Sequence, residues 1–240
     1  MCAMAADSCI GPLSVSTVYK AANAASIVAG GVATTFSMQA VLRASGIGRE
    51  HPAADLLLSP AAGLILKDAL GQCAAVGGMY FVPTGSMDRH FWAWRMAAAV
   101  LETAGMVCDS VTPFHGPSGF IGLAAVSSLC KAVACTAAAS SKAVCCQQLA
   151  GHAGVGTLTA ELASQTTMAY MLGTVVSFFI ALADGEDETD ALGGRRDART
   201  VGLVTLTSVI QVFTVWIGLK AVERHEESTA TAFGIRAKTT

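Results

Sequence analysis

The chain has 240 residues, of which 53% are hydrophobic and only 13% are charged, and its formal net charge is −2 at pH 7. Soluble domains carry about 25% charged residues, so this composition argues against a soluble domain and favours a membrane protein. The lack of a basic surplus excludes a typical nucleic-acid-binding protein. At about 20 residues per span, the length suits one all-α, polytopic transmembrane helix bundle of about six helices.

The first predicted span covers residues 21–42 and follows an N-terminal tail of residues 1–20, which does not have the pattern of a signal peptide. Small residues recur along it at every fourth position. Helices in lipid gain no hydrophobic driving force by associating, so small side chains that let two backbones approach mark a contact face. The predicted helix-packing residues are Ala21, Ala25, Ala29, Ala33 and Gly30.

Four weaker apolar segments follow: residues 64–82, 91–111, 118–139 and 143–158. Turns that contain Pro and Gly come before and after residues 91–111. Three residues after Leu158 come Glu161, Ser164 and Gln165, which we interpret as the cap of the next helix. Acceptors near a helix N-terminus satisfy its free N–H groups.

Two long runs near the C-terminus, residues 166–183 and 200–219, contain no Asp, Glu, Lys or Arg. Each is long enough to cross a bilayer, which takes about 17 to 25 residues as a helix. Residues 184–199 between them are strongly charged and are predicted to form a polar loop. The bundle is therefore expected to cover residues 21–220, and residues 221–240 to form a polar tail.

Several charged residues interrupt the apolar segments. Arg95, Glu102 and Asp109 are spaced by seven, which places them on one face of a helix. Charges inside a membrane normally face the bundle interior and pair with one another. Three readings stay open for them: ion pairs that fix packing, a transport path or metabolite site, or a 91–111 helix lying at the interface with its charges in water. The candidate polar cluster is Lys67, Asp68, Arg95, Glu102, Asp109 and Lys131.

Signals of catalysis or of a cofactor are missing from the sequence. No two His residues lie four apart on a predicted helix, and no nucleotide-binding glycine pattern follows a strand. The eight Cys residues form no C-x-x-C pair, and most lie in apolar runs where Cys behaves as a small hydrophobe. We therefore expect a non-catalytic protein without a metal or cofactor.

The charged segments resemble the root UVB sensitive family, also called the vitamin B6 photosensor family. The motifs that carry the likeness are Leu66-Lys67-Asp68-Ala69-Leu70-Gly71-Gln72, Met87-Asp88, Trp94-Arg95-Met96-Ala97-Ala98, Leu129-Cys130-Lys131-Ala132, Ser164-Gln165-Thr166-Thr167 and Gly173. The sequence departs from the family pattern at Leu64 and Ile65, where an aromatic is usual, and at Ala93, where a basic residue is usual. Its charges before Ser-Gln are thinned to Glu161.

This resemblance implies a polytopic protein of plastid, mitochondrial or other membranes, with a link to vitamin B6 homeostasis and to association with itself or with partners. The function we favour is that of an accessory subunit, embedded in the lipid bilayer and bound to the other membrane subunits of a larger complex. We expect it in the mitochondrial inner membrane rather than in a plastid. The alternative is a transporter or binding protein for a small charged metabolite such as a B6 vitamer. A water-filled cavity lined by the candidate charges would favour the alternative.

Overall fold

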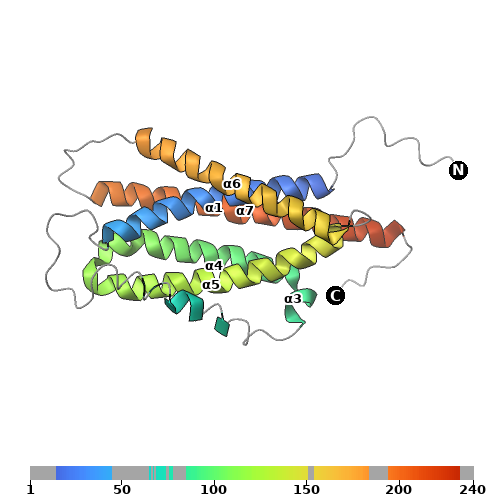
Figure 1. The fold of residues 1–240 in the computed structure, drawn as a ribbon, viewed down its shortest axis with the longest axis horizontal. Coiled ribbons are helices and arrows are strands. Elements are labelled where there is room, and N and C mark those ends of the chain that lie inside the picture. The colour runs from blue at the N-terminus through green and yellow to red at the C-terminus, as the bar shows by residue number, and fades with distance from the viewer. Residues whose placement is uncertain are drawn as a thin grey trace.

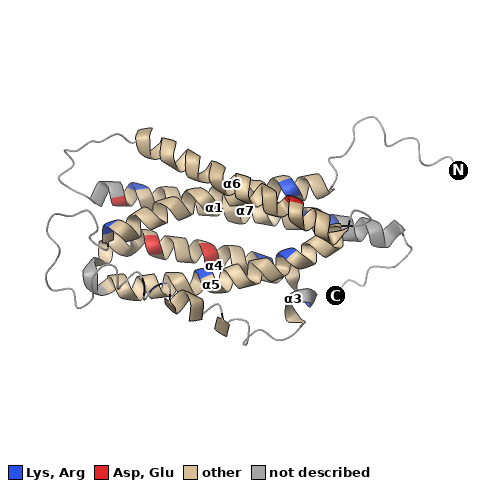
Figure 2. Cartoon of the chain, in the orientation of Figure 1, with Lys and Arg blue, Asp and Glu red and all other residues tan. Residues whose placement is uncertain are grey.

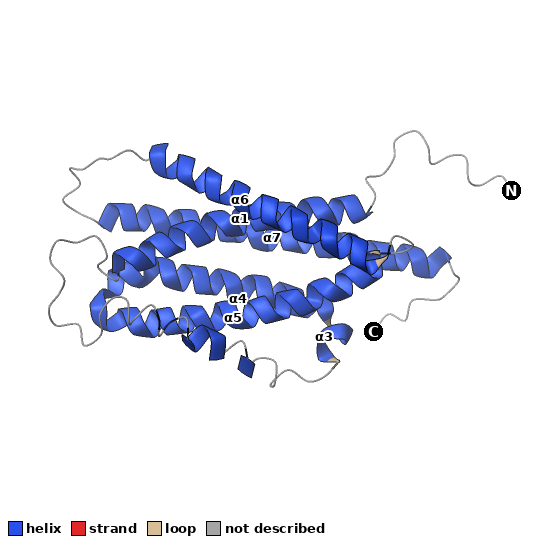
Figure 3. Ribbon diagram, viewed as in Figure 1, coloured by secondary structure: helices blue, strands red, loops and turns tan. Residues whose placement is uncertain are grey.

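The computed structural model describes residues 15–44, 65, 67, 69–73, 76–77, 85–150, 154–183 and 194–232. Every regular element within these ranges is a helix, as Figure 3 shows, so the all-α prediction is confirmed. The elements are α1 (Val15–Ala44), α3 (Ser86–Arg89), α4 (Phe91–Val111), the short 3-10 helix η1 (Thr112–His115), α5 (Gly116–Leu149), α6 (Val155–Ala183) and α7 (Gly194–Ala232).

The five long helices form two groups (Figure 1). Helices α1, α6 and α7 pack together, with α1 in contact with both of the others, and α4 and α5 pair along their lengths. Contacts from α4 to α7 and to α1 join the two groups, whereas α5 and α6 touch little. The two groups are therefore held together mainly through α4.

Four helical stretches are long and apolar enough to cross a membrane: Val15–Ala44, Gly119–Leu149, Val155–Ala183 and Asp197–Arg224. These support a polytopic helix bundle. Helix α4 does not qualify, because its apolar residues are interrupted by Arg95, Glu102 and Asp109. It packs against α1, α5 and α7 in the bundle, so these charges are turned toward protein rather than toward the interface.

Ion pairs at the two ends of the bundle give its thickness. Lys20 of α1 pairs with Glu161 of α6 at one end, and Arg43 of α1 lies 3.4 Å from Asp197 of α7 at the other. Lys20 and Arg43 are 23 residues apart along α1, which is about 35 Å of helix at ~1.5 Å per residue. A bilayer's hydrocarbon core is about 30 Å thick, so the stretch of α1 between the two pairs is long enough to cross it.

Two predicted boundaries are wrong in the middle of the chain. Segments 118–139 and 143–158 are not separate, because α5 runs without a break from Gly116 to Leu149. The expected break fell at residues 140–142, but the Lys142 amine donates a hydrogen bond to Thr166 inside the bundle and the helix continues through it. The chain turns at Gly154 instead, whose φ of 80° is a left-handed conformation that suits glycine.

The ends of the last two helices also differ from the prediction. Helix α6 begins at Val155, so Glu161 lies inside it and pairs with Lys20 rather than capping a helix. Helix α7 begins at Gly194, within the segment expected to be a loop, and continues through the expected polar tail to Ala232. Apolar run length marks only the part of a helix that lies in lipid, and polar residues extend α6 and α7 beyond it.

Candidate functional site

A cavity of about 580 Å³ lies inside the bundle and is lined by residues of α1, α4, α5, α6 and α7. Ligand sites in proteins typically measure about 300 to 1,000 Å³, so a small metabolite fits. Apolar clusters flank it on both sides. One contains Tyr19, Leu162 and Leu219, and the other contains Phe36 and Met106. The cavity is therefore a mainly apolar space with a few charged and polar side chains in its wall, and it lies between two apolar layers.

The charges of the cavity wall are mostly positive. Arg95, Lys131 and Lys142 line it together with a single carboxylate, that of Glu102. Figure 2 shows charged residues along α4 and α5, on the sides of these helices that belong to the bundle, in addition to those of α1, α6 and α7. An unneutralised charge in a membrane costs a few kcal/mol or more, so this arrangement needs a reason.

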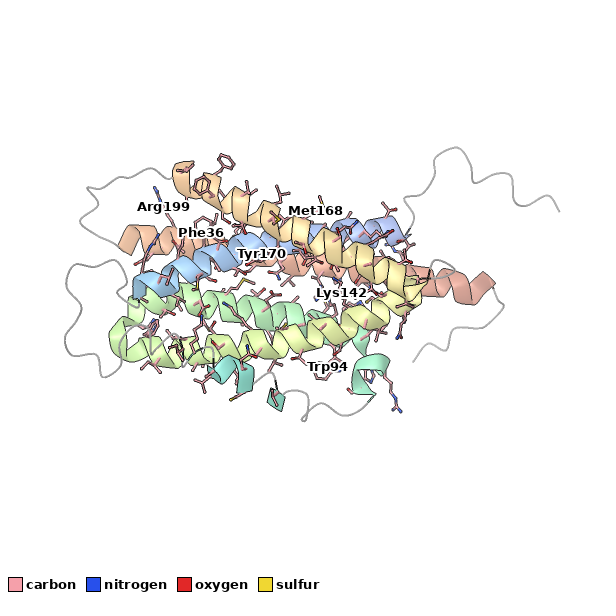
Figure 4. All side chains as sticks on the ribbon, viewed as in Figure 1. Phe36, Trp94, Lys142, Met168, Tyr170 and Arg199 are labelled. Atoms are coloured by element: carbon pink, nitrogen blue, oxygen red, sulfur yellow. The ribbon has the colours of Figure 1, made fainter. Side chains whose placement is uncertain are left out.

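One group of polar side chains joins α5 to α6 across the cavity. The Lys142 amine donates a hydrogen bond of 3.2 Å to Thr166 Oγ1, and Tyr170 lies one turn further along α6 on the same wall. Figure 4 labels Lys142 and Tyr170 on neighbouring helices. Because a lysine amine has three donors and Thr166 takes one, Lys142 keeps donors for a ligand.

A second polar group joins α4 to α7. The Gln211 amide donates a hydrogen bond of 2.8 Å to the Glu102 carboxylate. Gln211 lies directly against Gly30 of α1, where an added Cβ would be only 3.2 Å from its Nε2. The missing side chain of Gly30 therefore leaves the space that Gln211 occupies. Glycine is explained here by this close contact and not by an unusual backbone conformation.

A buried ion triad lies beside the cavity. The Asp109 carboxylate, 1% exposed, pairs with Lys131 and has the Lys67 amine at 3.6 Å. Gly105 makes room for Lys131, since an added Cβ there would lie 2.8 Å from Lys131 Cγ. This triad ties α4 to α5 and to the segment around Lys67. It is an interior pairing of the kind expected of charges in a membrane, and its three members all belong to the predicted cluster.

The six predicted cluster residues thus divide into three sets. Arg95, Glu102 and Lys131 line the cavity, Asp109 and Lys67 form the triad with Lys131, and Asp68 lies outside the described residues. An ion pair between Asp68 and Arg95, one of the pairings that such a polar cluster allows, stays a prediction.

Sequence reasoning missed most of the lining residues, among them the polar residues Asn23, Lys142 and Gln211. A signal for Lys142 was present: it follows Lys131 by eleven residues, about three turns, which places both amines on one helix face. The assumed break between two segments hid that periodicity.

The predicted packing row on α1 divides in two. Ala29, Ala33 and Gly30 are buried, whereas Ala21 and Ala25 are exposed. The first part of the row is turned away from α7, because the neighbouring row packs there, with the Ala22 methyl 3.3 Å from a Cβ built at Gly218. Small residues do form the contact, but near the N-terminus of α1 the row that contains Ala22 forms it and the row that contains Ala21 and Ala25 does not.

Comparison with known proteins gives the family. The vitamin B6 photo-protection and homoeostasis domain matches residues 12–226. Protein root UVB sensitive 3 of Arabidopsis thaliana is 27% identical over 147 residues, which cover 60% of this chain and 32% of that protein. RUS family member 1 of Dictyostelium discoideum is 21% identical over 147 residues, covering 61% of this chain and 27% of that protein.

The match therefore spans about a third of the length of these curated relatives. No solved structure matches the chain. The domain match covers nearly all of the bundle and agrees with the charged motifs of α4, α5 and α6. The chain therefore belongs to the root UVB sensitive family, whose shared domain is described as a vitamin B6 photo-protection and homoeostasis domain.

Proposed function

We propose that this protein is a non-catalytic membrane protein that binds a small charged metabolite in its interior cavity and moves it across or along the membrane. The observation that carries this proposal is an interior cavity whose mainly apolar wall carries Arg95, Lys142 and Glu102, together with Lys131, which is paired with Asp109. This cavity lies between apolar layers, in a bundle whose helices are long enough to cross a bilayer. A protein that only fixed its neighbours' positions would not need this space.

The family supports a B6 vitamer as the metabolite. Its domain is described by vitamin B6 photo-protection and homoeostasis, and B6 vitamers are small, polar and charged. The cavity offers both cationic and anionic groups, as such ligands require. Homoeostasis needs proteins that bind or distribute a vitamer as well as enzymes that make it.

Binding and flux test the proposal together. The full chain in nanodiscs is titrated with pyridoxamine, and proteoliposomes are loaded to measure its uptake. Ala139→Trp should abolish both, because Ala139 lines the cavity and a Trp side chain fills it. Val126→Trp is the matched control, since Val126 is an exposed residue of the same helix and does not line the cavity. Equal binding by both variants would overturn the proposal.

The second candidate is an accessory subunit of an organellar complex, with the mitochondrial inner membrane expected over the plastid. Large apolar side chains of α6 are exposed, among them Met168, Met171 and Phe179, and a partner subunit could cover them as lipid does. Purification of the native protein from membranes separates the candidates. Fixed stoichiometry with a respiratory or photosynthetic complex, without vitamer binding, would favour the subunit.

A further inference from the structure

We propose that Asn23, Arg95 and Lys142 form a phosphate-binding end of the cavity, so that its ligand is a small phosphate monoester rather than the phosphate-free compound. This inference rests on the proposed function and deepens it by naming the ligand class. The ligand's other end, by the same reasoning, carries a hydrogen-bond donor that meets Glu102.

The three side chains lie at one level of the bundle. Helices α1 and α7 run antiparallel, with Ala22 against Gly218 and Gly30 against Gln211. Helices α4 and α7 are also antiparallel, with Lys220 over the Trp92 ring and Gln211 bonded to Glu102. Arg95, three residues after Trp92, therefore lies at the level of Gly218, and so of Ala22 and Asn23.

Lys142 reaches the same level from α5. Its partner Thr166 lies five residues after Glu161, and Glu161 pairs with Lys20. Since α1 and α6 run in the same direction, Thr166 is level with residues 23–26 of α1. Lys142 and Arg95 are also close enough to interact electrostatically. Three helices thus bring an amide, a guanidinium and an amine to one place.

These groups keep hydrogen-bond donors that the protein does not use, although Arg95 also interacts electrostatically with Glu102. Among the residues that the structure describes, Arg95 makes no hydrogen bond or ion pair, and Lys142 has only the Thr166 hydroxyl. The Asn23 side chain is 6% exposed, lines the cavity, and its Nδ2 has no partner within the described ranges. A buried donor without an acceptor is unfavourable, so the Asn23 amide in particular favours binding of an acceptor.

A phosphate suits this set of donors. A guanidinium binds phosphate through two parallel hydrogen bonds, an amine adds a point charge, and an amide supplies neutral donors. A phosphate monoester carries close to two negative charges at neutral pH, which would neutralise both cations. A carboxylate would neutralise only one of them.

The opposite end of the cavity sets the ligand's polarity. Glu102 is seven residues from Arg95 on the same face of α4, which is about 10 Å at ~1.5 Å per residue. Its carboxylate accepts a bond from Gln211 and has acceptor sites left for a ligand donor. Tyr170 lies on the wall and offers an aromatic surface. A phosphorylated pyridine with a basic ring nitrogen has a matching polarity.

Calorimetry on the full chain in nanodiscs tests this assignment with pyridoxamine 5′-phosphate and pyridoxamine. Neither has an aldehyde, so neither forms imines with surface lysines. The wild-type protein should bind the phosphate ester at least about tenfold more tightly. Arg95→Gln and Lys142→Gln should each weaken phosphate-ester binding roughly ten- to hundredfold, and pyridoxamine binding by less than about threefold, since a charged hydrogen bond contributes about 1.5–3 kcal/mol.

Lys220→Gln is the matched control, because Lys220 is a cation that does not line this cavity. It should leave both affinities unchanged. If a Gln variant does not fold, Arg95→Lys and Lys142→Arg keep the charge and should keep the preference for the phosphate ester.

Equal affinity for the two compounds in the wild-type protein, or unchanged binding in the Gln variants, would overturn the phosphate site and leave the proposed function standing. Binding of neither compound would overturn the proposed function itself.

Discussion

Replacing Gly173 by Ala tests whether α6 lies as close to α1 as the structure places it. A Cβ at residue 173 would lie 2.6 Å from the Val28 carbonyl oxygen and 3.2 Å from Gly31 Cα. Both are backbone atoms, which cannot rotate away, so one helix has to shift. Overpacking of this kind costs about 1–3 kcal/mol, and the steepness of this contact places Gly173→Ala in the upper half of that range.

Unfolding in mixed micelles with increasing SDS measures the change, followed by the fluorescence of the three Trp residues. Gly156→Ala is the control, because Gly156 lies in the same helix and has no atom within 4 Å of an added Cβ. It should be neutral or slightly stabilising, since Ala is the better helix former. An equal free energy of unfolding for Gly173→Ala and the wild-type protein would refute the close helix contact.

Three further predictions follow from the packing and the charges. Asp109→Asn should lower stability by about 3–5 kcal/mol, as removing one partner of a buried ion pair does, and Lys131→Met in the same chain should recover part of it; thermal unfolding of the single and double variants checks this. Ala29→Leu should destabilise the bundle by about 1–3 kcal/mol while Ala25→Leu, at an exposed position, should not, as native gels and thermal unfolding would reveal. Residues 184–193 should be cut by protease from the side of the membrane opposite to the C-terminus; cleavage of both from one side would contradict two spanning helices.

Composition and run length were enough to predict an all-helical membrane bundle, because lipid leaves few alternatives to a helix. They failed at the helix ends. A helix can continue through a charged residue when another helix supplies a partner for its side chain. Lys142 donates a hydrogen bond to Thr166, and Glu161 forms an ion pair with Lys20. Such partners lie more than twenty residues away and leave no local signal in the sequence.

The candidate site shows the same division. Spacing by seven placed Arg95 and Glu102 on one face, and both line the cavity. Gln211 was hidden in a run with no charged residues, because its role comes from Glu102 and Gly30, far away in the chain. Asn23 was hidden among alanines for the same reason. Neutral polar residues in apolar helices are therefore candidate site residues, as charged residues are.

Protection of Cys135 tests the central claim most directly, because this residue is exposed and lines the cavity. A chain that keeps only Cys135 is labelled with a maleimide in nanodiscs, with and without pyridoxamine 5′-phosphate. A chain that keeps only Cys73, which is exposed and does not line the cavity, is the control. We expect the ligand to slow labelling of Cys135 and to leave Cys73 unchanged. Unchanged labelling of Cys135 at ligand concentrations that saturate binding would show that the metabolite binds elsewhere and would contradict this account.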